Sequence, residues 1–443
     1  MKYSTNDIKT TLDSCINELS NDSWLFVKNP DKDFSRKRKL PFDLMLKSIV
    51  CMGGGSLNNE LLDYFKLDPD TPSKSAFIQQ RNKILPDAFY RLFRIFTNSV
   101  KPSLFYREYR LLAVDGSDIH VPTDENDADS FHPGTNGQKP YNLLHLNALY
   151  DLCANIYTDA IIQKSRKKNE RTAFNDMVDR LDSDQPTILM ADRGYEAYNT
   201  LAHIQEKGLN FLIRVQDVNG AGILKGLNVP RDGEFDLSFN LAISRKQTNK
   251  GKALCKNKNE YKFINSKTTF DFLPKNNGHA PVEPYMLKFR VVRFKLSDDT
   301  YEAIVTNLPS DSFPPEELKS LYAMRWGVET SFRGLKFTVG LMLFHAKKIE
   351  SIYQEIFASL TMYNFTQIII ANTIIKQKKT KYCYKIDFSA AVHTCRKYIC
   401  DNISPSNIEA LLPKYVVPIR EDRSYKRKIP KFKPTKGFLY RVA

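Results

Sequence analysis

The run TILMADRGY at residues 187–195 decides the fold class of this protein. Its first five residues are apolar or β-branched, and Asp192 follows them directly. The run LLAVDG at residues 111–116 repeats the pattern, with Asp115 after the apolar residues and a glycine next to it. Short apolar runs bounded by turn residues are typical of strands buried inside a sheet. The two runs therefore predict two interior strands, each ending at an aspartate.

The segments around these two runs alternate between strand and helix patterns. The sequence predicts strands at residues 145–150, 155–163 and 209–215, helices at 170–182 and 196–207, and a hairpin from 286–296 and 301–306. Strands that alternate with helices indicate a unit with helices packed on a central sheet. The fold class that we expect is therefore α/β.

The chain divides into five regions by composition and pattern. We expect a helical N-terminal DNA-binding region at residues 1–105, a first part of the core at 106–215, a β-rich insertion at 216–285, a second part of the core at 286–380, and a C-terminal region with a basic tail at 381–443. In the first region, helices on either side of a turn carry basic and amide side chains, as a helix-turn-helix DNA reader does. The alternative is an ordinary helical domain with a solvated basic run.

Composition and charge narrow the class of protein. The 443 residues include 66 Lys or Arg and 50 Asp or Glu, so the formal net charge is +16. This charge favours polyanionic partners, above all nucleic acid, because neutralised phosphates release counterions. A hydrophobic content of 42% excludes wholesale disorder, and polar residues interrupt the apolar stretch 352–375, which argues against a membrane span. With no signal peptide and seven scattered cysteines, we expect a reduced, cytoplasmic protein.

The two aspartates suggest a metal site. An interior strand fixes a carboxylate at the edge of the sheet, and two such strand ends side by side bring like charges together. Divalent cations relieve that repulsion, and hard oxygen ligands favour magnesium or manganese. The alternative is that Asp115 and Asp192 only stabilise turns, as aspartates after strands often do.

The segment LYAMRWGVETSFRGLK at residues 321–336 adds a third carboxylate. On a helix that advances about 100 degrees per residue, four polar side chains fall within a sector of about 60 degrees: Tyr322, Arg325, Glu329 and Lys336. The apolar residues occupy the adjacent stripe, so such a helix packs on a core and presents the four polar groups to one place. The two glycines weaken a helix, so the pattern allows a break or bend. The alternative is a solvated polar edge with ordinary ion pairs.

Together these motifs resemble the DDE triad of bacterial insertion-sequence transposases. Asp115 in LLAVDGS, Asp192 in LMADRGY and Glu329 match its three acidic residues. The large class often called the IS-four family carries the signature Y-x-x-R-x-x-x-E-x-x-x-x-x-x-K. Here all three gaps are matched, by Tyr322, Arg325, Glu329 and Lys336. The resemblance covers residues 105–375 well, residues 36–100 loosely and the tail hardly at all.

The resemblance implies an RNase H-like catalytic core that the β-rich insertion interrupts. It assigns Asp115, Asp192 and Glu329 as catalytic residues and as ligands of two divalent ions, Mg²⁺ or Mn²⁺, in two-metal phosphoryl transfer. Members of this family cleave double-stranded DNA at the inverted repeats of a transposon and transfer the 3′ ends to target DNA. The resemblance further implies a homodimer that holds two ends in a synaptic complex, at the nucleoid and without a membrane partner.

The resemblance also suggests which side chains contact DNA. Tyr322, Arg325 and Lys336 are expected near the scissile phosphate, because Arg offers a planar fork and Lys a point charge. Trp326 is expected to stack on an unpaired base, with core packing as the alternative. Arg214 is expected to reach DNA, with a structural ion pair as the alternative.

Four further polar residues surround the first motif. Asp118 is a rival to Asp115, but it does not directly follow the apolar strand. We expect His120, His132 and His145 to have ordinary hydrogen-bonding roles, although they lie close enough in sequence to support the site.

Two other functions remain compatible with the sequence. One is a metal-dependent nuclease of the same fold, or a domesticated transposase, that cuts DNA without joining it. The other is a DNA-binding derivative that has lost catalysis. The intact set of three carboxylates argues against the second.

Overall fold

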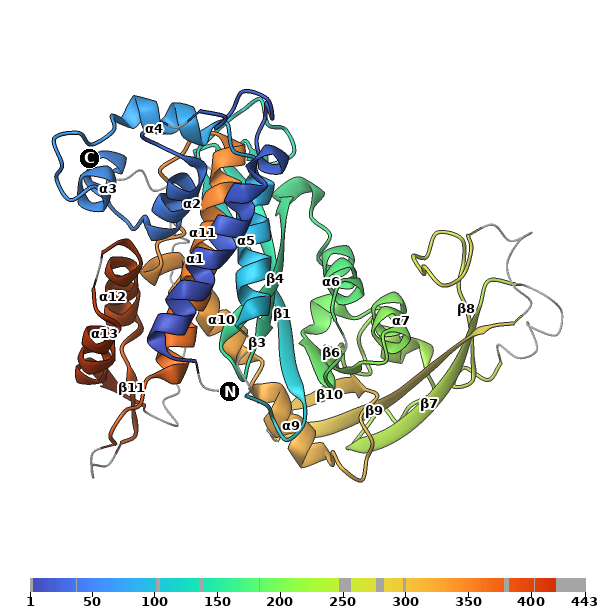
Figure 1. The fold of residues 1–443 in the computed structure, drawn as a ribbon. Helices are drawn as coiled ribbons and strands as arrows, with labels where there is room; N and C mark the ends of the chain where they lie inside the picture. The colour runs from blue at the N-terminus through green and yellow to red at the C-terminus, as the bar shows by residue number, and fades with distance from the viewer. Residues whose placement is uncertain are drawn as a thin grey trace.

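The computed structural model describes residues 3–36, 38–100, 104–134, 139–182, 184–246, 256–275, 283–297, 300–377, 382–401 and 403–419. Helices from both ends of the chain gather on one side of the molecule. A long sheet extends from them toward the other side (Figure 1). Ten of the described strands belong to this one sheet.

The first half of the sheet consists of the predicted core strands. β4 (Ile156–Lys164), β3 (Tyr141–Asp151) and β1 (Arg110–Val121) are antiparallel neighbours. On its other side β1 runs parallel to β5 (Thr187–Ala191), which in turn runs parallel to β6 (Asn210–Val215). The expected mixed α/β class is confirmed.

The second half of the sheet extends into the predicted insertion. β6 pairs with β10 (Thr300–Thr306), β10 with β9 (Tyr285–Ser297), and β9 with β7 (Phe235–Ser244), all antiparallel. Because β7 lies within residues 216–285, the described part of that region adds to the core sheet. Short strands lie at the margins: β2 (Phe131–His132) beside the start of β3, β8 (Tyr261–Phe263) parallel to β7, and β11 (Tyr384–Ile386) paired with β12 (Val416–Pro418) in a separate sheet.

Apolar side chains alternate along the core strands and bury both faces of the sheet. On one face, Leu112 and Leu189 share a core with α6 (Glu170–Asp179) and α7 (Tyr198–Glu206). Figure 1 shows these two helices side by side next to the sheet. Side-chain alternation thus explains why a short apolar run is needed at each interior strand.

The opposite face of the sheet is covered by a larger helical layer. Leu111 and Ile188 share its core with α5 (Pro86–Ser99), α10 (Trp326–Arg333) and α11 (Ile349–Asn372). This layer therefore lies over the strands that carry the two predicted aspartates.

α11 is the central helix of that layer. It is buried along most of its length and contacts α1 (Thr5–Asn21), α2 (Phe42–Cys51) and α12 (Phe388–Cys400) (Figure 1). The N-terminal and C-terminal helices consequently share one apolar core. The other described α-helices are α3 (Leu57–Tyr64), α4 (Lys74–Arg81), α9 (Pro315–Ala323) and α13 (Pro405–Leu411). Over the described residues, we find no helix with the length and apolarity that a membrane crossing requires.

In the N-terminal region expected to bind DNA, two polar side chains of α4 are buried. Arg81, the last residue of α4, is 3% exposed, and its guanidinium bonds to Gln354 and Glu355 of α11. Gln80 donates a hydrogen bond to the backbone carbonyl of Leu40. These two side chains hold α4 on the rest of the molecule and are not free to read base edges.

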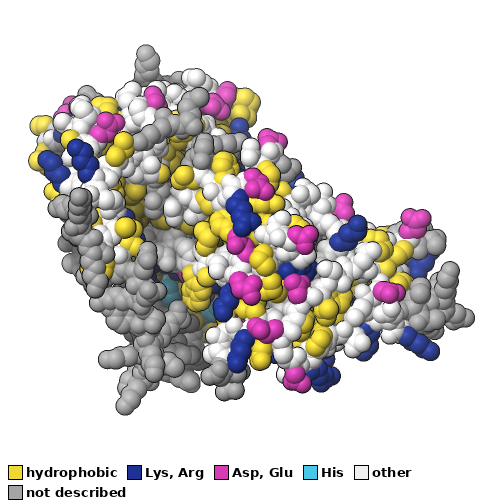
Figure 2. Space-filling view, turned by 90° about the horizontal axis from the view of Figure 1, so that it is seen from below, with side chains coloured by type: hydrophobic (Ala, Val, Ile, Leu, Met, Phe, Trp, Pro, Cys, Tyr) yellow, Lys and Arg dark blue, Asp and Glu magenta, His cyan; other side chains and the backbone are white. Residues whose placement is uncertain are grey.

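The charge of the protein is unevenly distributed along the chain. The basic tail predicted at residues 425–441 lies outside the described residues. Residues 420–443 hold nine Lys or Arg against two acidic residues, so they carry a large share of the net charge. On the face seen from below, the described acidic and basic side chains are mixed (Figure 2). Net charge alone therefore does not locate a DNA-binding surface there.

Candidate active site

The two predicted aspartates lie just past the point where two parallel strands stop pairing. β5 ends at Ala191, and Asp192 follows it directly, as predicted. β1, by contrast, continues through Asp115 to Val121, so the prediction that this strand ends at the aspartate was wrong. The reason is that β3 pairs with β1 along this length, whereas β5 pairs with it only up to Ala113. Asp115 therefore lies on a strand that is paired on one side and open on the other.

Neighbouring backbone groups fix both carboxylates. Asp192 Oδ1 accepts a hydrogen bond of 2.8 Å from the Gly194 amide, within the short turn Arg193–Tyr195. Asp115 Oδ1 accepts one of 2.8 Å from the Gly116 amide. Strand alternation places both side chains on the face of the sheet that α10 covers.

The third predicted carboxylate reaches the same face from α10. Arg325 Nη2 donates to Glu329 Oε1 at 2.9 Å, and its Nη1 lies 4.0 Å from Asp115 Oδ2. Arg325 is only 4% exposed. Its guanidinium is thus a buried counter-ion between two carboxylates from distant parts of the sequence.

The segment that carries Glu329 is not one continuous helix. α9 and α10 are separated at Met324 and Arg325, and not at either glycine. Arg325 keeps helical dihedral angles (φ −52°, ψ −31°), so the predicted phase between Arg325 and Glu329 survives the interruption.

A wider turn follows α10 and alters the position of the last signature residue. Residues Gly334–Thr338 form a π-helical turn, which shifts the phase of the side chains after it. Lys336 in this turn donates to the backbone carbonyl of Asp118 at 2.7 Å. Burial lowers the pKa of the Lys336 ammonium, partly offset by the charge of Asp118. Lys336 therefore lies against β1, three residues beyond Asp115.

Two aromatic rings flank the Arg325 guanidinium. Its central carbon lies 5.7 Å from the ring centroid of Tyr322 and 5.5 Å from that of Trp326, within the range of cation–π attraction. Tyr322 is buried, whereas Trp326 is 51% exposed. Of the two predicted aromatic contacts with DNA, only Trp326 presents its ring to solvent.

Arg214 takes part in the ion pair that the sequence left open as an alternative. Its Nη1 lies 3.4 Å from Glu302 Oε2, on the adjacent strand β10. The pair is partly exposed, so this carboxylate holds the Arg214 guanidinium at the margin of the site.

Electrostatics couple the three carboxylates. Burial, with a smaller contribution from the negative charges of Asp192 and Glu329, raises the pKa of Asp115 to about 6. The Gly116 amide and the Arg325 guanidinium act in the opposite direction. The net pKa is nevertheless raised, because burial outweighs the Gly116 amide and the Arg325 guanidinium.

The donor set suits a hard divalent cation, although the geometry is not that of a closed metal site. In the part of the chain that the structure describes, no three His, Cys, Asp or Glu side chains are grouped closely enough to hold an ion. Asp115, Asp192 and Glu329 offer only carboxylate oxygens, which Mg²⁺ and Mn²⁺ prefer. The raised pKa of Asp115 marks a place where added positive charge is favourable. An ion would therefore have to draw these side chains together.

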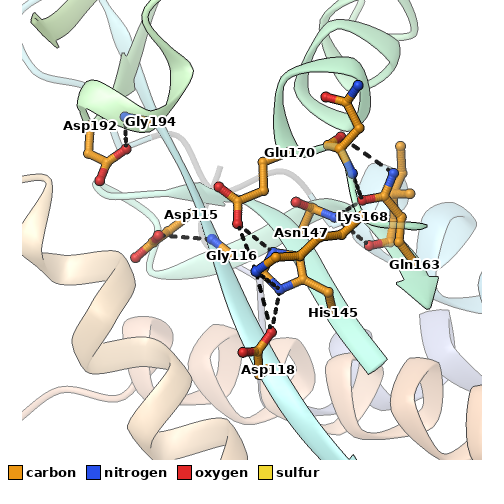
Figure 3. Close-up of polar contacts among 12 residues, drawn as sticks. Asp115, Gly116, Asp118, His145, Asn147, Gln163, Lys168, Glu170, Asp192 and Gly194 are labelled. Carbon is orange, nitrogen blue, oxygen red and sulfur yellow. Dashed lines mark hydrogen bonds and ion pairs between the residues drawn. The ribbon is translucent and has the colours of Figure 1, made fainter. Parts of the chain in front are cut away.

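Sequence reasoning missed one acidic residue beside the site. Glu170, the first residue of α6, lies with His145 and Asp118 in a cluster on the other face of β1 (Figure 3). An acidic residue in the first turn of a helix is common, so no local pattern singles out Glu170. It comes near Asp115 only through the packing of α6 on the sheet.

Comparisons with known proteins identify a family and a distant likeness in fold. Among solved structures, the piggyBac transposase synaptic complex with hairpin DNA is similar at 10% sequence identity and a TM-score of 0.44, over 92% of this chain and 81% of that chain. Among curated proteins, none matches this chain. The family model described as "Transposase DDE domain" matches residues 106–365, which is more than half of the chain. The chain therefore belongs to the transposase DDE domain family.

Proposed function

We propose that this protein is a transposase that cleaves DNA at transposon ends and transfers the 3′ ends to target DNA. The observation that carries the proposal is the gathering of Asp115, Asp192 and Glu329 on one face of the sheet, with Arg325 between two of them. Concentrated carboxylates in a protein of net charge +16 suit metal-assisted phosphoryl transfer on DNA.

The order of the core strands supports an RNase H-like core. Three antiparallel strands, β4, β3 and β1, are followed by the two parallel strands β5 and β6, which is the arrangement that characterises this fold. After β6 the chain forms β7 and β8 before it returns as β9 and β10. We therefore infer that the region between β6 and β9 is an insertion in the catalytic core, ahead of the helix with Glu329.

The cofactors that this site would hold are two Mg²⁺ or Mn²⁺ ions, with Asp115, Asp192 and Glu329 as ligands. When bound, such ions activate the attacking oxygen and stabilise the leaving oxygen of the phosphodiester. A pKa of about 6 leaves Asp115 mostly ionised at neutral pH, as a cation ligand must be. Arg325 keeps Glu329 in place through its 2.9 Å hydrogen bond and lies near Asp115.

The side chains proposed to contact DNA surround these carboxylates. They are Tyr322, Arg325, Trp326, Lys336 and Arg214. The exposed ring of Trp326 can stack on an unpaired base. Lys336 would exchange the backbone carbonyl of Asp118 for a phosphate oxygen. Arg214 would exchange the Glu302 carboxylate for a phosphate oxygen. Tyr322 and Arg325 are buried, so contact with DNA would require the site to open around them.

Recognition and assembly follow from the same proposal. Two transposon ends must be held together for transfer, so we infer a homodimer in the synaptic complex. The N-terminal helical region is proposed to bind the inverted repeats. Because Gln80 and Arg81 are buried, we assign base reading to the exposed side of α4, which includes Lys74 and Gln79.

A strand-transfer assay tests the proposal. The substrate is a duplex of the DNA end that flanks the gene, nicked in advance to leave a free 3′-hydroxyl, and it is mixed with a plasmid target and Mg²⁺. We expect joined product from the wild-type protein and none from Asp115→Ala, Asp192→Ala or Glu329→Ala. Each variant should still bind the end in a mobility-shift measurement, which excludes a folding defect.

The alternatives give different products in the same assay. On the pre-nicked end, neither alternative would leave a joined product. A parallel reaction with an intact end separates the two, because a nuclease of the same fold would cut it and a non-catalytic derivative would bind it without cutting. Near-normal cleavage by any one of the three alanine variants would show that its carboxylate is not part of the catalytic set.

A further inference from the structure

His145 is held between two carboxylates directly behind the proposed catalytic strand. Its Nδ1 lies 2.6 Å from Asp118 Oδ1, and its Nε2 lies 3.0 Å from Glu170 Oε1 (Figure 3). His145 is 3% exposed. Burial lowers its pKa, but the hydrogen bond with Asp118 and the nearby Glu170 carboxylate outweigh burial, so the pKa of His145 is raised. The ring is thus a buried link between β1 and the first turn of α6.

The ring also touches the residue next to Asp115. His145 lies opposite Asp118 in the β1–β3 ladder, on the same face as Gly116 and on the opposite face from Asp115. A methyl group on Gly116 would overlap Nε2 of the imidazole. Only glycine leaves room for the ring at this point, which gives a packing reason for the Asp-Gly pair in the first motif.

Glu170 extends the link to the loop that holds Asp192. A methyl group on Gly194 would lie 3.7 Å from Glu170 Oε2, so this carboxylate faces the loop. Arg171, the next residue, donates from Nε to the Gly194 carbonyl at 2.8 Å. The Gly194 amide in turn holds Asp192 Oδ1. The first turn of α6 therefore contacts the second motif on one side and His145 on the other.

Asp118 connects the same ring to the third motif. Its side chain bonds to His145, while its backbone carbonyl accepts the hydrogen bond of Lys336. His145 is consequently a buried side chain that joins segments from all three motifs. Lys168 lies nearer the surface and also pairs with Asp118 and Glu170, at 3.8 and 3.5 Å.

We propose that His145 is a positioning residue that fixes the spacing of Asp115 and Asp192, through Gly116 on one side and Glu170 on the other. The proposal rests on the proposed function, since it assigns His145 a role toward the divalent ions. Under this proposal His145 contacts neither DNA nor an ion. It acts through the motifs of Asp115 and Asp192. Its loss should weaken ion binding while the protein stays folded.

The chain supplies a matched control in His203. That ring is also buried between two carboxylates, with Nδ1 2.8 Å from Asp179 Oδ1 and Nε2 3.0 Å from Asp271 Oδ2. The pKa of His203 is likewise raised, because its two hydrogen bonds outweigh burial. His203 links α6 and α7 to residue 271 and contacts none of the three motifs in the described structure. Its loss removes the same kind of interaction at a different place.

Calorimetric titration of the whole protein with Mn²⁺, without DNA, tests the proposal. Outer residues that hold metal ligands in place typically change affinity by about tenfold to a hundredfold. We expect His145→Ala to weaken Mn²⁺ binding by at least about tenfold and His203→Ala to weaken it by less than about twofold. The two variants should lower the urea midpoint of unfolding by similar amounts relative to the wild type. Equal Mn²⁺ affinities for His145→Ala and wild type would overturn the inference.

A double substitution tests the route through Gly116. Gly116→Ala displaces the ring and should weaken Mn²⁺ binding as His145→Ala does. With the ring already removed, the same methyl should have little further effect, so the two changes should not be additive. Full additivity would show that His145 does not act through Gly116. His145→Gln, which keeps a donor at the position of Nε2, should restore part of the lost affinity if the contact with Glu170 matters.

A reference variant separates this inference from the proposed function. Asp115→Asn should abolish the Mn²⁺ site if the proposed function is correct. Wild-type binding that Asp115→Asn leaves unchanged would overturn the metal assignment itself. Binding that Asp115→Asn abolishes but His145→Ala preserves would overturn only the role of His145.

Discussion

Replacing Asp115 with asparagine should make the metal-free protein more stable at neutral pH, although it removes a proposed catalytic group. Burial, together with the charges of Asp192 and Glu329, raises the pKa of Asp115 from 3.8 to about 6. The folded protein therefore disfavours the ionised carboxylate, whereas the unfolded chain does not. One pKa unit corresponds to about 1.4 kcal/mol, so ionising Asp115 lowers the free energy of unfolding by about 3 kcal/mol.

The sign of this effect depends on pH. The destabilisation is complete when the pH is above the pKa of Asp115 in the folded protein, about 6. It disappears as the pH falls below the pKa of this group in the unfolded chain, 3.8. The free energy of unfolding of Asp115→Asn should therefore exceed that of the wild type by up to about 3 kcal/mol at about pH 7.5. The difference should shrink steadily as the pH falls from about 6 toward about 4.

Urea unfolding followed by circular dichroism in the presence of a chelator measures this difference. Asp118→Asn is the matched control, because it lies on the same strand but its pKa is lowered by the hydrogen bond from His145. The control should lose stability at pH 7.5, the opposite sign. Adding Mn²⁺ should stabilise the wild type but not Asp115→Asn, since binding to the folded state raises its stability. If both variants shifted in the same direction, the argument from burial and like charge would be refuted.

Further predictions concern the helical layer and DNA binding. Burial raises the pKa of Glu355, but Arg81 and His345 outweigh it and hold the value at about 2, so Glu355→Gln should cost about 3–5 kcal/mol in urea unfolding at neutral pH by leaving Arg81 unpaired. A cost under about 1 kcal/mol would contradict a buried ion pair there. Lys336→Ala should weaken end binding and reduce the slope of log affinity against log salt by about one; an unchanged slope would argue against a phosphate contact. Trp326→Ala should weaken binding to a single-stranded end by about 1–3 kcal/mol in a fluorescence titration, with little change in the urea midpoint because the ring is half exposed.

The features that the sequence predicted are those set by local pattern. The apolar run before Asp192 predicted the bounds of β5, because every residue of a short buried strand is apolar or β-branched and these residues are consecutive in the sequence. The placement of Arg325 and Glu329 on the same side of their segment followed from helical phase, which brings residues four apart together. Both depend on a few neighbouring residues and on nothing distant.

What the sequence could not predict depends on pairing and packing between distant segments. β1 runs past Asp115 because β3 pairs with it there, and no residue near Asp115 reveals that partner. Arg81 belongs to the region expected to bind DNA, yet its guanidinium is buried against Glu355, which lies far along the chain. Glu170 reaches the site only because α6 packs on the sheet next to His145.

The burial of α11 between helices from both chain ends limits how this transposase can be engineered. α4 is held to α11 through Arg81, Gln354 and Glu355, and α12 packs on the same helix. The N-terminal helices therefore cannot be exchanged as an independent unit. A chimera that replaced them would disrupt the apolar core that covers the strands carrying the proposed catalytic residues. Under the proposed assignment of base reading to α4, retargeting to a new transposon end would redesign its exposed side chains, such as Lys74 and Gln79, and keep its buried side.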